Sequence, residues 1–142
     1  MRPIYVAVKV QIKLGTQATI EQKQKRELDI LGEIGGHLRI VSLLSFTEPT
    51  FYYQFVFPLY DIEFHGFIRN GSLRYAPGCC GPLVSVATIV LEGVAYIRSL
   101  NIIHRDVKPG NMLVRRPLWT EFTAVLSDFA SAAKVLAAQW LH

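Results

Sequence analysis

Apolar and other residues alternate along the first twelve positions, and this pattern predicts a β-strand over Ile4–Ile12. One face carries Ile4, Val6, Val8, Val10 and Ile12, and the other carries Tyr5, Ala7, Lys9 and Gln11. Because both faces hold apolar groups, we predict an inner strand of a sheet. Lys9 then projects from a partly covered face, where a buried cation needs a partner.

A helical period follows over Thr19–Ile34. Thr19 and Gln22 match the capping-box pattern at its start, and Gly35-Gly36 predicts its end, since glycine readily takes the left-handed conformation that closes helices.

Glu27 interrupts the apolar stripe of this predicted helix. It shares a side with Ile20, Leu31 and Ile34, at steps of seven, four and three residues. A carboxylate on an apolar stripe requires a cation nearby, and Lys9 is the candidate.

Three further segments complete the first half of the pattern. Strands are predicted at Arg39–Phe46 and Phe51–Phe57, with a turn at Glu48-Pro49 between them. Residues 61–82 hold several glycines and prolines and are predicted to be mostly loop.

The second half predicts one helix and one strand pair. Leu83–Leu100 is apolar almost all round, which indicates a buried helix, and the strands are expected at Met112–Val114 and Ala124–Leu126. Glu92 interrupts the apolar run, which is also short of the ~20 residues that span a membrane, so no membrane partner is expected.

Composition narrows the class of protein. The 142 residues are 51% hydrophobic and 18% charged, which fits one folded domain and excludes a disordered chain. The net charge is +4, and the basic groups gather only at 23–26 and at Arg115-Arg116. We interpret both groups as solvated surface rather than as nucleic-acid contacts.

Cys79 and Cys80 are the two cysteines of the chain. Neighbouring residues rarely reach disulfide geometry, and no second cysteine pair or histidine spacing indicates zinc. A reducing intracellular setting, in the cytoplasm or nucleus, is therefore expected.

The strongest chemical signal is the stretch from His104 to Asn111. It sets Asp106, Lys108 and Asn111 at short fixed spacing, and Pro109 stiffens the segment. Val6-Ala7-Val8-Lys9 lies upstream of it, and Asp128-Phe129 lies downstream. Phosphoryl transfer from ATP needs such a set, with metal ligands, a cation for phosphate oxygens and a carboxylate for the attacking hydroxyl.

In order and spacing these motifs resemble those of eukaryotic protein kinases of the serine/threonine type. The resemblance implies ATP and Mg²⁺ as cofactors. It implies that Asp106 acts as catalytic base, that Lys108 stabilises the transferring phosphate, and that Asn111 and Asp128 hold magnesium. It also implies that Lys9 contacts the α- and β-phosphates while Glu27 holds Lys9.

The resemblance extends to the apolar positions. Phe57 is expected at the back of an adenine pocket, with the hinge from Pro58 through Leu59 and Tyr60 to Asp61. Ala7 and Leu113 are expected to sandwich the adenine ring. A separate stack is expected of Leu31, His104 and Phe129.

The implied fold class is α+β and protein-kinase-like. Residues 1–57 would form an incomplete small lobe, with an antiparallel sheet and the helix that carries Glu27. Residues 58–61 would form the hinge, and residues 62–142 the first part of the helical large lobe through Asp128-Phe129-Ala130.

Three departures from the family pattern bear on activity. No Gly-x-Gly-x-x-Gly precedes Lys9, so nucleotide affinity is expected to suffer. Ala130 replaces the glycine of the usual motif, which would cost about 1 kcal/mol if that position required positive φ. No alanine-proline-glutamate motif follows before His142, fourteen residues beyond Asp128.

Two functions are therefore carried forward. The first is a serine/threonine protein kinase that transfers the ATP γ-phosphate to a protein hydroxyl, with a regulatory protein partner as a further possibility. The alternative is an inactive truncated kinase fragment, or a pseudokinase-like module that binds a partner through uncovered apolar faces.

Overall fold

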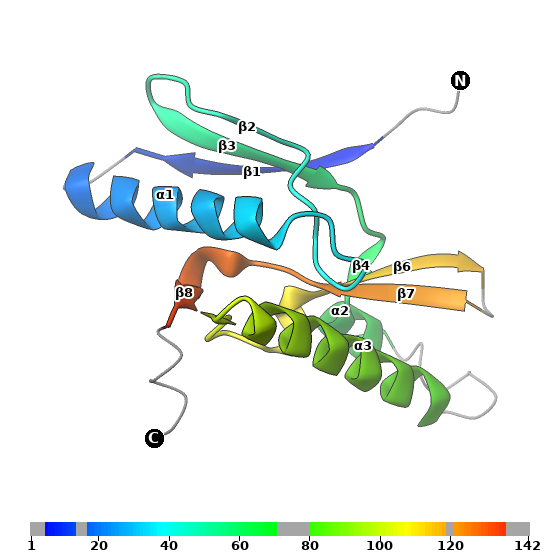
Figure 1. The fold of residues 1–142 in the computed structure, drawn as a ribbon. Coiled ribbons are helices and arrows are strands. Elements are labelled where there is room, and N and C mark those ends of the chain that lie inside the picture. Colours follow the sequence, from blue (N-terminus) through cyan, green and yellow to red (C-terminus); the bar gives the residue numbers. More distant parts are fainter. Residues whose placement is uncertain (1–4, 14–16, 71–79, 119–120, 136–142) are drawn as a thin grey trace.

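The computed structural model describes residues 5–13, 17–70, 80–118 and 121–135. They form two parts, one above the other in Figure 1. The upper part is an antiparallel sheet with one long helix, α1 (Gln17–Ile34), along one face. The lower part combines the hairpin of β6 (Met112–Leu118) and β7 (Glu121–Leu126) with a second long helix, α3 (Cys80–Ser99).

The upper sheet has the order β1-β3-β2, with β1 at Val6–Ile12, β3 at Tyr52–Pro58 and β2 at Ser45–Thr47. All its pairings are antiparallel, and Lys9 lies opposite Phe55. This confirms the predicted antiparallel sheet beside the Glu27 helix. Among the described residues β1 pairs with β3 alone, so the structure does not show the predicted inner position of this strand.

The face of β1 opposite Lys9 is exposed. Val6, Val8, Val10 and Ile12 are between 43% and 60% exposed. Helix α1 packs on the opposite face, where the fully buried Phe55 meets Ile30, Leu31 and Ile34. A strand with apolar residues on both faces gives the same pattern whether one face or both are covered.

Helix α1 begins two residues before the predicted start. Thr19 therefore lies inside the helix, and the predicted capping box is wrong, because a capping residue must lie outside the helical conformation. The predicted end is confirmed. Gly35 has φ of 61°, and its N–H donates to the Leu31 carbonyl at 3.3 Å.

The strand predicted over Arg39–Phe46 is mostly absent, since only Ser45 and Phe46 of that range belong to β2. The preceding residues pair with the lower part of the molecule instead. The Leu126 N–H donates to the Arg39 carbonyl at 2.9 Å, and the Val41 N–H donates to the Leu126 carbonyl at 3.0 Å. These bonds tie the segment after α1 to β7.

Part of the predicted loop over 61–82 forms regular secondary structure. It contains β4 (Ile62–Glu63), α2 (Phe64–Arg69) and the first residues of α3, while residues 71–79 lie outside the described part. Buried Phe64 and Phe67 fix α2 against α3, and β4 pairs with β6. Aromatic burial outweighed the turn-forming residues nearby.

The long helix and the strand pair were predicted correctly, but both are longer than expected. Short elements were missed: β5 (Ile102–Ile103), which pairs with β8 (Ala133–Lys134), and the 3₁₀ turns η1 (Pro109–Asn111) and η2 (Phe129–Ser131). Strands of two residues carry no usable periodicity.

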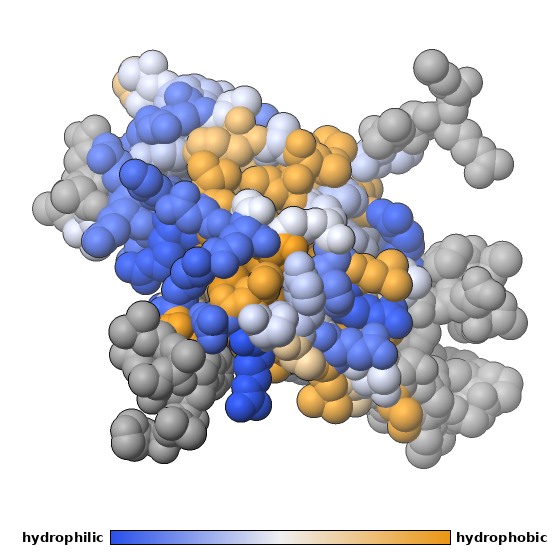
Figure 2. Space-filling model, in the orientation of Figure 1, coloured by the Kyte–Doolittle hydropathy of each residue, from blue (hydrophilic) through white to orange (hydrophobic). Residues whose placement is uncertain are grey.

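The main core joins the two parts through side chains of α1, β3, α3, β7 and η2. Figure 2 shows polar side chains over the outward face of α1 and apolar ones over the sheet above it. Among the described residues, no helix is long and apolar enough to cross a membrane.

Candidate functional site

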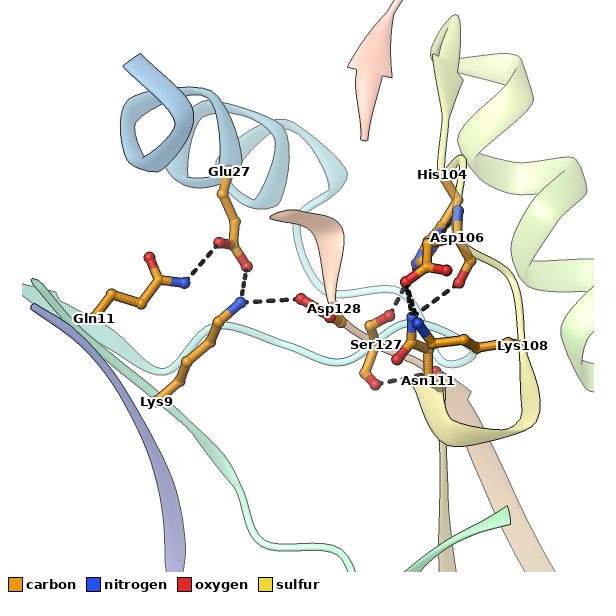
Figure 3. Close-up of polar contacts among 9 residues, drawn as sticks. All are labelled: Lys9, Gln11, Glu27, His104, Asp106, Lys108, Asn111, Ser127 and Asp128. Atoms are coloured by element: carbon orange, nitrogen blue, oxygen red, sulfur yellow. Dashed lines mark hydrogen bonds and ion pairs between the residues drawn. The ribbon is translucent and has the colours of Figure 1, made fainter. Parts of the chain in front are cut away.

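The site begins with a lysine that bridges two carboxylates from distant parts of the chain. Lys9 Nζ lies 2.8 Å from Glu27 Oε1 and 3.0 Å from Asp128 Oδ1 (Figure 3). The Glu27 side chain is 2% exposed, and a carboxylate buried to this extent needs a cation as its partner. The partnership expected for Lys9 and Glu27 is present in the structure, and Asp128 joins it.

The charge of Lys9 is secured by these neighbours. Burial lowers the pKa of Lys9, but the hydrogen bonds and charges of Glu27 and then Asp128 outweigh it, so the pKa lies above its ordinary value. Lys9 is therefore a permanent cation at neutral pH, suited to phosphate oxygens.

Gln11 also contacts Glu27, which was not predicted from the sequence. Its Nε2 donates to Glu27 Oε2 at 3.5 Å. Gln11 shares a face with Lys9 at a spacing of two residues, so the strand period could have identified it.

A second group of polar side chains lies in the loop that ends at η1. Asp106 Oδ2 accepts hydrogen bonds from Lys108 Nζ at 2.7 Å and from Asn111 Nδ2 at 2.9 Å. These bonds, Lys108 first, lower the pKa of Asp106, and the bond to Asp106 raises the pKa of Lys108. Asp106 is thus an ionised acceptor, oriented between a cation and an amide.

Buried hydrogen bonds hold this loop. His104 Nε2 donates to the Ser127 carbonyl at 2.9 Å, and His104 Nδ1 accepts from the Asp106 N–H at 3.3 Å. Asn111 Nδ2 also donates to the Asp106 carbonyl at 2.8 Å, and the Ser127 N–H donates to the Asn111 carbonyl at 2.8 Å. The loop is therefore fastened to the end of β7 next to Asp128.

Stability should depend on pH through His104. Burial lowers its pKa below the ordinary 6.5. As pH falls, the unfolded chain therefore binds a proton at this histidine at higher pH than the folded chain does. The stability that neutral His104 contributes is complete above the ordinary pKa and is lost as pH falls below it. We expect the free energy of unfolding to fall by up to about 1.4 kcal/mol per pH unit there. Urea denaturation at several pH values, with His104→Gln as comparison, measures it; an unchanged slope in that variant would contradict this role.

The segment after β7 places Asp128 and Phe129 on opposite sides of the backbone. Asp128 has φ of 62° and its side chain reaches Lys9, whereas Phe129 is 1% exposed and meets the His104 ring edge-to-face at 4.7 Å. Leu31 and Phe129 lie in one core cluster, as expected for the predicted stack. Ala130 lies in η2 without positive φ, so the expected strain at Ala130 does not arise.

A cavity of about 550 Å³ lies between the two parts of the molecule. It is lined by nine residues expected around the nucleotide, and Asp61 of the expected hinge is not among them: Ala7, Lys9, Glu27, Phe57, Pro58, Leu59, Tyr60, Leu113 and Asp128. Asn111 lines it as well, whereas Asp106 and Lys108 are not among the described residues of its wall. Their carboxylate and ammonium groups lie beyond Asn111.

Some lining residues were not predicted from the sequence, Ile62 and Glu63 among them. Ile62 and Glu63 belong to β4, within the range predicted to be loop. Their sequence carries no local signal, because they are placed by pairing with Val114 and Leu113 of β6.

Asn111 and Asp128, the two residues expected to hold magnesium, both line the cavity. The side-chain Nδ2 of Asn111 is committed to Asp106, which leaves the side-chain Oδ1 for a metal, and Asp128 contributes a half-exposed carboxylate. Such a donor pair suits Mg²⁺, which takes one or two protein ligands together with substrate phosphates. Within the described part of the chain, no cluster of three or more His, Cys, Asp or Glu forms an all-protein metal site.

Comparison with known proteins shows which family this chain resembles. A family model described as protein kinase domain matches residues 2–140. The chain is 31% identical over 80% of its length to a probable serine/threonine-protein kinase of Dictyostelium discoideum, covering 21% of that protein. It is 32% identical over 75% of its length to a probable CTD kinase subunit alpha homolog of Encephalitozoon cuniculi, covering 30% of it.

A third relative is the liver/testis isoform of the phosphorylase b kinase gamma catalytic chain of Mus musculus, 26% identical over 96% of this chain. The chain covers 33% of that protein, so it spans between a fifth and a third of these three relatives. With the family model matched over almost its whole length, and with an α+β fold and these motifs, the chain belongs to the protein kinase domain family.

Proposed function

We propose that this chain is a serine/threonine protein kinase that transfers the γ-phosphate of ATP to a Ser or Thr hydroxyl of a protein. One observation carries the proposal. Lys9, from the first strand, contacts both buried Glu27 and Asp128, a residue 119 positions away, at the wall of a cavity that Asn111 also lines. This contact joins the two parts of the molecule around one site.

The cavity supplies nucleotide binding. Phe57, Ala7 and Leu113 offer an apolar slot for a flat base, and the hinge from Pro58 to Tyr60 offers backbone groups at its edge. Lys9 faces the same space and would neutralise phosphate oxygens. Magnesium, when bound by Asn111 and Asp128, would offset phosphate charge.

The loop residues supply the transfer step. The ionised Asp106 would accept a hydrogen bond from the attacking hydroxyl and aim its oxygen at the γ-phosphorus. Lys108 now contacts Asp106 and is 55% exposed, so its ammonium could turn to the transferring phosphate. A lysine at this position also favours Ser or Thr over Tyr as acceptor, by the family resemblance.

Transfer to paired peptides tests the proposal. With γ-labelled ATP and Mg²⁺, we expect the 142-residue chain to label a serine peptide and not its tyrosine counterpart. Lys108→Met should lower kcat by roughly ten- to a hundredfold, because one cation on the transferring phosphate is lost. The Kd for ATP should change little, since Lys108 lies outside the cavity wall. Labelling of the tyrosine peptide alone would reject the serine/threonine assignment.

The exposed row on β1 favours a second candidate. Val6, Val8, Val10 and Ile12 form a continuous apolar strip on an edge strand, which suits a partner-binding module without catalysis. A folded chain that binds ATP but labels no peptide would support this function over the first.

A further inference from the structure

Arg115 fastens the hinge from outside the expected site. Its Nη2 donates to the Leu59 carbonyl oxygen at 3.0 Å, and its guanidinium lies 4.9 Å from the centre of the Tyr60 ring. The residue after Tyr60 is also held by β6, because the Asp61 N–H donates to the Val114 carbonyl at 3.0 Å. Strand β6 therefore holds the hinge through two adjacent residues. The sequence had placed Arg115 only on a solvated surface.

The contact to Leu59 fixes the orientation of a peptide group. The Leu59 carbonyl and the Tyr60 N–H belong to one planar trans peptide, so they point in opposite directions. Leu59 and Tyr60 both line the cavity, while Arg115 is not among the described residues of its wall. A carbonyl held toward Arg115 leaves the Tyr60 N–H directed to the cavity side.

The guanidinium is well suited to this task. Its plane can stack on the half-buried Tyr60 ring while one nitrogen donates to the carbonyl beside that ring. Tyr60 itself packs against the main core, which holds its ring in place beside Arg115. A lysine could reproduce the charge and one donor, but it could not stack as a plane.

We propose that Arg115 is a positioning residue that sets the base preference of the nucleotide site. This inference rests on the proposed function, since it concerns the same cavity. A fixed Tyr60 N–H would donate to N1 of adenine, which is an acceptor. The N1 of guanine carries a hydrogen, so two donors would face each other and one would stay unpaired.

Nucleotide affinities of three variants test the role. Calorimetry with Mg-ATP and Mg-GTP would compare the wild-type chain with Arg115→Met, Arg115→Lys and, as matched surface control, Arg69→Met at the exposed end of α2. We expect Arg115→Met to weaken ATP binding about tenfold and to leave GTP binding nearly unchanged, because a charged hydrogen bond that orients the hinge is lost. Arg115→Lys should recover part of the ATP preference, and Arg69→Met all of it.

The outcomes separate this inference from the proposed function. If the wild type prefers ATP and Arg115→Met keeps the same preference and affinity, the inference is overturned and the nucleotide site stands. An equal loss for ATP and GTP would also overturn it, since that result indicates a general structural effect. If the folded wild type binds neither nucleotide, the proposed function fails, and this inference fails with it.

Discussion

Replacing Asp106 with asparagine should lower kcat for peptide phosphorylation by about a thousandfold. The substitution keeps the size of the side chain and removes its charge. Asp106 is the only carboxylate that both Lys108 and Asn111 contact among the described residues, and its pKa is lowered by those contacts. In the proposed mechanism, the acceptor hydroxyl would then lose the group that orients it.

ATP binding separates a catalytic loss from a folding defect. Asp106 is not among the described residues of the cavity wall, so Asp106→Asn should bind ATP within about twofold of wild type. Asp29→Asn, an exposed carboxylate on α1, is the matched control and should retain full kcat. A variant at position 106 with undiminished kcat would refute the assigned role.

Replacing Phe129 with alanine should cost about 3–5 kcal/mol of unfolding free energy. Phe129 is 1% exposed and packs between the His104 ring and the core cluster that includes Leu31. Alanine would leave a cavity where α1, the loop that carries His104 and η2 meet. Asp128, the adjacent residue, would then lose its fixed position beside Lys9.

Two comparisons make this measurement specific. Phe129→Leu should cost less than about 1.5 kcal/mol, because most of the volume is retained. Phe51→Ala removes the same ring at a site 76% exposed and should change stability by less than about 0.5 kcal/mol. Urea denaturation of all three gives the values, and a Phe129→Ala cost no larger than that of Phe51→Ala would contradict the packing described here.

The pairing of Lys9 with Glu27 could be predicted from the sequence. The strand period placed Lys9 on a covered face, the helical period placed Glu27 on an apolar stripe, and each charge required a partner. Asp128 was different. No local pattern links Asp128 to Lys9, which lies 119 positions earlier. Only the resemblance of the motifs to a known family placed Lys9, Glu27 and Asp128 in one site.

Other features depend on long-range pairing and could not be predicted. Within the described part of the chain β3 pairs with both β1 and β2, and the residues of the three strands do not encode this order. Residues Arg39 to Val41 look like a strand but bond to Leu126 in the other part of the molecule. The contact of Arg115 with the hinge arises in the same way, from strand β6 passing beside β4 (Figure 1).

Magnesium-dependent ATP binding to the 142-residue chain, measured by calorimetry, tests the central claim that Lys9, Glu27, Asn111 and Asp128 form a nucleotide site. The account predicts binding that requires Mg²⁺ and weakens at least about tenfold in Asp128→Asn, because the substitution removes a metal-binding charge. A chain that is folded by circular dichroism but binds no ATP, or binds it equally well after that substitution, would contradict the account.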